Sequence, residues 1–101
     1  MENAEQFAKR FLKNASALEN VDLRSENINT TIWKGVMLVV ETESSRILMG
    51  KYAPCEQRKN YPYWLVLAPC IVKDSAGERK VERYKIDFDA VEKLSYVRAI
   101  V

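Results

Sequence analysis

Few residues of this chain could carry out chemistry. The sequence has no histidine, which is the usual general base and the commonest metal ligand. Its two cysteines, Cys55 and Cys70, therefore lack a histidine partner for a zinc site and a base to activate a thiolate. Asp87 and Asp89 stand close together, but aspartates beside a turn usually cap it. The three glycines are scattered and form no phosphate-binding loop. We expect no enzyme activity, no metal and no cofactor.

Cationic and aromatic side chains provide a second kind of chemistry. A polar loop at residues 53–62, bracketed by prolines, leads into an aromatic strand, and a strand at residues 79–88 should carry cations along one side. Cations neutralise phosphates, and exposed rings stack on bases. We predict a nucleic-acid-binding surface made of seven residues: Arg58, Lys59, Tyr61, Trp64, Arg79, Arg83 and Lys85. The alternative is that the rings anchor the core and the cations form an ordinary solvated face.

Length and composition predict one domain over residues 1–101. The chain has 101 residues, of which 48% are hydrophobic, as in ordinary globular proteins. A net charge of +2 neither requires nor excludes an anionic partner. No apolar run approaches the length of a membrane span, and no signal peptide is evident. We therefore expect a cytoplasmic protein with reduced cysteines and no contact with a membrane.

An amphipathic helix is predicted at residues 3–19. Asn3 and Gln6 form a capping-box pattern at its start. Apolar residues then recur at helical spacing on one side of the helix: Phe7, Ala8, Phe11, Leu12, Ala15 and Leu18. Residues 21–29 are expected to be a polar connector.

Five strands are predicted after the helix, at residues 31–42, 46–52, 63–72, 79–88 and 94–100. Residues 31–42 are apolar on both faces, which is typical of a central strand covered on both sides. Gly35 and Gly50 are candidate bend points, and Pro69 marks an edge, a bulge or an end. Asp89 and Glu92 indicate a single helical turn before the last strand.

This order of elements resembles the Sm-like fold. The apolar runs at residues 36–40 and 47–50 look like the first two strands of that family, and the second of them carries a glycine. Residues 64–67 are similar to its third strand, and residues 84–87 and 94–97 to its final pair. The resemblance implies a small barrel, RNA binding, and a ring in which the fourth strand of one subunit pairs with the fifth of the next.

The chain departs from the family at the residues that hold RNA. Where the family places an aspartate and an asparagine before its third strand, this loop has Glu56, Arg58, Lys59 and Asn60 in another order. The Arg-Gly or Lys-His pair near the last two strands is replaced by residues 87–90, Asp-Phe-Asp-Ala. The resemblance therefore does not transfer the family's uridine pocket to this chain.

We predict a mainly β protein of the α+β type, with an N-terminal helix and a five-stranded bent antiparallel sheet. The sheet is expected to form a small barrel of the SH3 or Sm-like type. Its expected function is that of a non-enzymatic binding module that forms homo-oligomers through strand edges and binds RNA or single-stranded DNA. The alternative is a small adaptor or inhibitor, like the accessory proteins of phages and mobile elements, that binds protein partners without nucleic acid.

Overall fold

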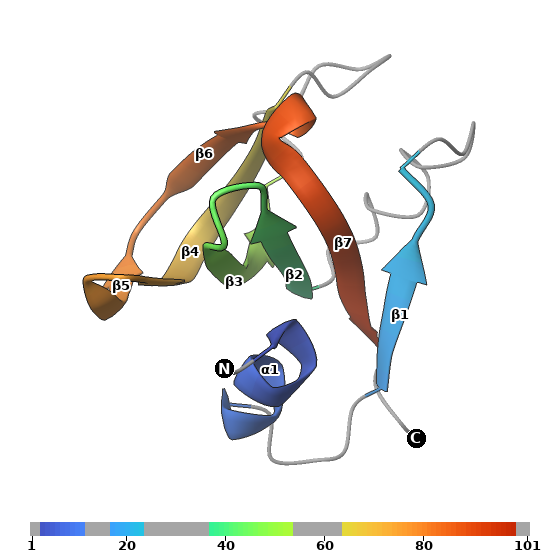
Figure 1. Ribbon diagram of the computed structural model, residues 1–101, viewed down its shortest axis with the longest axis horizontal. Helices are drawn as coiled ribbons and strands as arrows, with labels where there is room; N and C mark the ends of the chain where they lie inside the picture. The colour runs from blue at the N-terminus through green and yellow to red at the C-terminus, as the bar shows by residue number, and fades with distance from the viewer. Residues whose placement is uncertain (1–2, 12–16, 24–36, 54–63, 99–101) are drawn as a thin grey trace.

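The computed structural model describes residues 3–11, 17–23, 37–53 and 64–98. One helix, seven strands and a 3₁₀ turn follow one another in these ranges (Figure 1). In chain order they are α1 (Ala4–Phe11), β1 (Ala17–Val21), β2 (Met37–Thr42), β3 (Ile47–Tyr52), β4 (Trp64–Asp74), β5 (Gly77–Val81), β6 (Tyr84–Asp87), the 3₁₀ turn (Phe88–Ala90) and β7 (Val91–Arg98).

The strands form a single antiparallel sheet in the order β1-β7-β2-β3-β4-β5, and β6 also pairs with β4. β5 pairs with residues 70–74 of β4, and β6 pairs with residues 64–67. Together they act as one interrupted edge strand. The sheet curls, but its end strands β1 and β5 are not paired with each other (Figure 1). The mainly β prediction is confirmed, and within the described ranges the predicted five-stranded barrel is corrected to an open sheet of seven strands.

The helix begins as predicted but ends earlier. The amide of Gln6 donates to Asn3 Oδ1 at 2.8 Å, and the amide of Asn3 donates to Gln6 Oε1 at 3.1 Å, which completes the capping box. The prediction of helix to residue 19 is wrong, because Ala17–Val21 is strand β1. An apolar residue at every third or fourth position does not exclude a strand, and five residues of β1 pair with β7. Residues 12–16 lie outside the described ranges.

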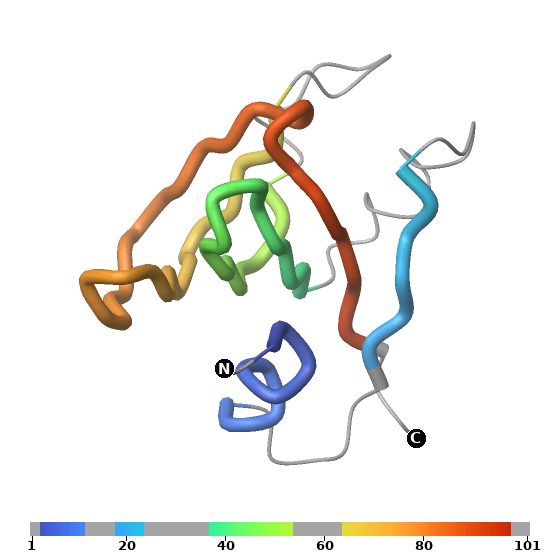
Figure 2. The backbone as a smooth tube through the Cα atoms, in the orientation of Figure 1, coloured from blue at the N-terminus to red at the C-terminus, as the bar shows by residue number. Residues whose placement is uncertain are grey.

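The predicted strand at residues 79–88 is two strands, β5 and β6, separated at residues 82–83. The break lies opposite Ala68 and Pro69, which are joined by a cis peptide and pair with neither strand. Figure 2 shows the chain turning sharply after β6 into β7. The 3₁₀ turn Phe88–Ala90 confirms the single helical turn expected before the last strand, but Glu92 lies in β7 and not in the turn.

Gly50 and Pro69 mark the place where β3 and β4 change register, as expected of bend points. A Cβ atom on Gly50 would lie 2.5 Å from the backbone oxygen of Pro69 and 2.8 Å from the Cβ of Leu67. Only glycine allows the two strands to approach this closely. The other predicted bend point, Gly35, lies outside the described ranges.

Side chains pack on both faces of the sheet. The inner face of the curl buries one cluster: Leu38, Val40, Leu48, Tyr52, Leu65, Leu67, Cys70, Val72, Ile86, Phe88, Val91 and Leu94. The opposite face, against which α1 lies, buries a smaller one: Ala4, Phe7, Ala8, Val39, Ile47 and Met49. We call these the inner face and the helix face. The prediction that the first predicted strand is covered on both sides is confirmed for β2, since Leu38 and Val39 lie in different clusters.

Candidate functional site

Four of the seven predicted nucleic-acid-binding residues lie in the described structure, and the other three, Arg58, Lys59 and Tyr61, lie outside it. Trp64 begins β4, Lys85 lies on β6, Arg79 lies on β5, and Arg83 lies between β5 and β6. Arg79, Arg83 and Lys85 are exposed and Trp64 is half-buried.

Trp64 and Lys85 lie together on the side of the sheet opposite the inner face, which we call its outer side. The Nζ atom of Lys85 is 4.4 Å from the centroid of the Trp64 ring, which is a cation–π contact. Their neighbours Leu65 and Ile86 pair with each other and are buried in the inner cluster. Because side chains alternate along a strand, Trp64 and Lys85 point the other way. Asp87, the cross-strand partner of Trp64, adds a carboxylate to the same surface.

Arg79 lies on the opposite side of the sheet from Lys85. Its cross-strand partner Val72 is buried in the inner cluster, so Arg79 is on the inner face. The break at residues 82–83 changes the alternation, because odd positions face inward on β5 and even positions face inward on β6. The expectation that Arg79, Arg83 and Lys85 line one face is therefore corrected. An unbroken strand would have put Arg79 and Lys85 on the same side.

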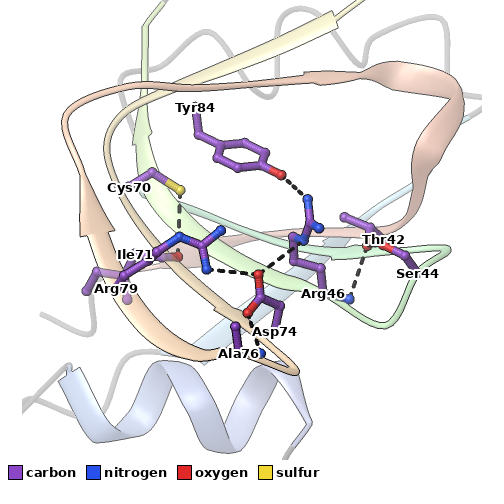
Figure 3. A network of polar contacts seen from close by, with 9 residues as sticks. All are labelled: Thr42, Ser44, Arg46, Cys70, Ile71, Asp74, Ala76, Arg79 and Tyr84. Carbon is purple, nitrogen blue, oxygen red and sulfur yellow. Dashed lines mark hydrogen bonds and ion pairs between the residues drawn. The ribbon is translucent and has the colours of Figure 1, made fainter.

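A polar network that the sequence analysis missed joins two turns at one end of the sheet (Figure 3). Its centre is Asp74, whose Oδ2 accepts a hydrogen bond from Arg79 Nη1 at 2.9 Å and whose Oδ1 accepts one from the amide of Ala76 at 2.9 Å. Arg46 Nε lies 3.7 Å from Oδ2. The hydrogen bond from Arg79 and then that from Ala76 lower the pKa of Asp74, against a small opposing effect of desolvation.

Arg46 connects this carboxylate to the rest of the sheet. Its Nη1 donates to the hydroxyl of Tyr84, and its guanidinium lies 6.0 Å from the centroid of that ring. Its backbone amide donates to Thr42 Oγ1 at 3.1 Å across the β2–β3 turn. In that turn Ser45 has a φ of 62°, a conformation uncommon for a residue other than glycine. The turn-forming residues around Ser44 and Asp74 were the available signal in the sequence.

Two cavities flank the β2–β3 turn, and each mixes cations with carboxylates. The larger, of about 500 Å³, is lined by Ser44, Ser45, Arg46, Ile47, Lys73, Asp74, Ser75 and Ala76. The smaller, of about 230 Å³, is lined by Asn3, Glu41, Thr42, Ser45, Arg46, Ile47 and Glu92.

Cys70 is buried in the inner cluster. Burial raises the pKa of its thiol to about 12, although a backbone hydrogen bond from Met49 acts in the other direction. The thiol also contacts the carbonyl oxygen of Ile71 at 3.6 Å. At neutral pH Cys70 is therefore a protonated packing residue. Within the described ranges no three cysteine, aspartate or glutamate side chains gather closely enough to hold a metal ion.

The sheet edges are the remaining candidate for function. β7 pairs with β2 on one side and with β1 on the other, so both of its edges are occupied over much of its length. The last strand is the one whose edge the Sm-like resemblance implies for ring assembly. Among the described residues, the strands with only one paired edge are β1 and the interrupted strand β5–β6.

No protein-family model matches this chain, and no curated protein matches its sequence. No helix in the part of the chain that the structure describes is long and apolar enough to cross a membrane.

Proposed function

We propose that this chain is a non-enzymatic binding module of Sm-like form that associates with further copies of itself through the edges of its sheet. The single observation that supports this function is the open sheet, with β1 and β5–β6 each paired along one edge within the described ranges. An unpaired edge presents a row of backbone donors and acceptors that another strand can satisfy.

The side chains of β5 agree with a role at the surface. Residues 77–80 are all exposed, and Val81 is half-buried. A strand exposed on both faces contributes little to the core of its own chain. Its charged residues prevent indiscriminate pairing and allow pairing with a strand of complementary charge.

Sedimentation equilibrium over a wide concentration range tests this function. We expect the average mass to rise with concentration, and the amides of β5 to gain protection from hydrogen exchange as it does. The amides of β3, which is paired on both sides, serve as the internal control. A constant monomer mass with unchanged exchange of β5 would contradict self-association.

Binding of single-stranded nucleic acid is a second candidate, supported by the contact between Lys85 and Trp64 on the outer side of the sheet. Phosphates would contact the cation and a base would contact the ring. Lys85→Gln should then reduce the salt dependence of oligonucleotide affinity by about one unit of slope. Lys51→Gln, which changes an exposed lysine on β3, is the matched control.

Oligonucleotide binding should be measured at low salt, where an electrostatic contact is strongest. An affinity that responds equally to Lys85→Gln and to Lys51→Gln would rule out this surface. No binding at all would leave the adaptor or inhibitor that recognises only protein partners.

A further inference from the structure

We infer that β1 of one copy of this chain pairs antiparallel with β5 of a second copy, so that the sheets join head to tail. This inference rests on the proposed function, since it names the partner and the two strands that meet. It differs from the contact implied by the Sm-like resemblance, because β1 already covers the edge of β7.

The two strands lie at opposite ends of the sheet. β1 and β5 are the first and last strands in the order of the main sheet, and Figure 1 shows them on opposite sides of the molecule. Each has one edge without a strand partner among the described residues. Joining them would therefore continue the sheet without displacing any of the strand pairings within the described ranges.

The faces of the two strands can be matched residue by residue. On β1, Val21 packs against the inner cluster and Leu18 against the helix-face cluster. Glu19 lies two positions from Val21 and therefore shares the inner face. On β5, Val81 packs against the inner cluster, and Glu78 on the other side pairs with Arg10 of α1. Arg79, two positions from Val81, shares the inner face.

Full-length antiparallel pairing of the two strands places inner positions opposite inner positions. Val21 then lies opposite Gly77, and Glu19 lies opposite Arg79 at the centre. Directly opposed residues have Cβ atoms about 5 Å apart, so this carboxylate and guanidinium would be in contact. The guanidinium of Arg79 has five donors, which allows it to bind Asp74 and a second carboxylate together.

Symmetric pairing of the same strands is opposed by charge. Two β5 strands in full antiparallel register would place Arg79 opposite its own copy, and two β1 strands would do the same with Glu19. Like charges directly opposite each other destabilise a strand pair. The same two side chains therefore favour the head-to-tail contact over both symmetric contacts. Such a contact forms a ring if the rotation closes and a filament if it does not.

Charge reversal tests the contact. The variants are Glu19→Lys and Arg79→Glu, with Lys51→Glu as a control reversal on an exposed position of β3. We expect each of the first two to weaken self-association at least tenfold and the control to leave it unchanged. An equimolar mixture of Glu19→Lys and Arg79→Glu should associate as the unmodified chain does, because each variant supplies the charge that the other has lost.

The readout is average mass by light scattering at matched concentrations, with circular dichroism to verify folding. Because Arg79→Glu also loses the hydrogen bond to Asp74, Arg79→Gln serves as a second variant and should weaken association in the same direction. If the unmodified chain associates but the Glu19 and Arg79 variants behave like the Lys51 control, or the mixture fails to regain association, the β1–β5 contact is wrong while edge association stands. A strictly monomeric unmodified chain would overturn both.

Discussion

Two neighbouring residues of β3, Leu48 and Met49, face different layers of this molecule. Leu48 lies in the inner cluster, which the strands of the curled sheet build among themselves together with the 3₁₀ turn. Met49 lies in the helix-face cluster, whose buried sheet residues are Val39, Ile47 and Met49, with four partly buried sheet residues packed around them: Leu18, Met37, Ile71 and Val97. The difference indicates that the inner face maintains the fold and that α1 is a thinner layer added to it.

The polar contacts of α1 also indicate that the helix is a layer added to the sheet. The amide of Ala4 at its start donates to Glu41 Oε1 at 3.0 Å, and Arg10 near its end pairs with Glu78 on β5. The first contact is partly buried and the second is exposed. They position the helix on the sheet, whereas the apolar contact of Phe7, which is fully buried, supplies most of its attachment.

Leu48→Ala tests this comparison with the largest expected effect. We expect it to lower the free energy of unfolding by about 4 kcal/mol, because the rigid inner cluster cannot collapse into the cavity. Urea denaturation followed by tryptophan fluorescence provides the measurement.

Met49→Ala is the matched control on the same strand. Its expected cost is about 2 kcal/mol, since the eight-residue helix can shift to fill the space. Equal losses for the two variants would contradict the view that the inner face is the more rigid layer.

Gly50→Ala should lower the free energy of unfolding by about 3 kcal/mol, because the added methyl group meets the backbone of β4. Gly77→Ala is a useful comparison. Gly77 has open space for a Cβ but a φ of 114°, so any cost there comes from the backbone conformation alone. A neutral Gly50→Ala would show that β3 and β4 can separate, and that the inner face is softer than we infer.

Acid should remove the stabilising contribution of Asp74, which lies on β4 at one end of the sheet, more than that of the ion pair between Glu78 and the helix. The pKa of Asp74 is lowered in the folded state, so Asp74 contributes stability above the unfolded value of about 3.9 and loses it as pH falls through the lower folded value. Asp74→Asn should therefore flatten the decline of stability in this acidic range. Glu78→Gln, at the ion pair with α1, is the comparison, and an equal flattening would contradict a special role for Asp74.

Cys70 reports on the inner face directly. With its pKa raised to about 12 by burial, the thiol should resist a disulfide reagent at neutral pH unless the chain unfolds. Labelling of a Cys55→Ser variant, in which Cys70 is the only thiol, should follow the unfolded fraction in urea. Rapid labelling without urea would mean that the inner cluster opens locally.

The sequence predicted the parts of the fold that depend on local pattern. Alternation and apolar runs located β2, β3 and β4, and the capping box located the start of α1. β1 was missed because five residues without strong alternation become a strand only by pairing with β7, far away in the chain. The division of β5 from β6 was missed because it depends on β4, where Ala68 and Pro69 interrupt the pairing.

The candidate sites, too, depend on contacts between segments that are far apart in the sequence. A cluster of cations and aromatic residues in the sequence did not reveal which side of the sheet each occupies, and the break at residues 82–83 placed Arg79 and Lys85 on opposite sides. The network around Asp74 joins Asp74 of β4 to Arg79 of β5, to Arg46 in the β2–β3 turn and, through Arg46, to Tyr84 of β6. Turn-forming residues indicated the two turns, but no spacing in the sequence shows that the turns meet.

The position of β1 has a practical consequence for anyone who shortens this chain. A fragment starting at Met37 would keep most of the inner cluster yet leave the backbone of residues 94–98 bare on one side. Strand edges with unpaired backbone groups pair with one another, so such a fragment would precipitate or form artificial dimers. The leading segment therefore belongs to the smallest well-behaved unit of this protein, although it adds few residues to the inner cluster.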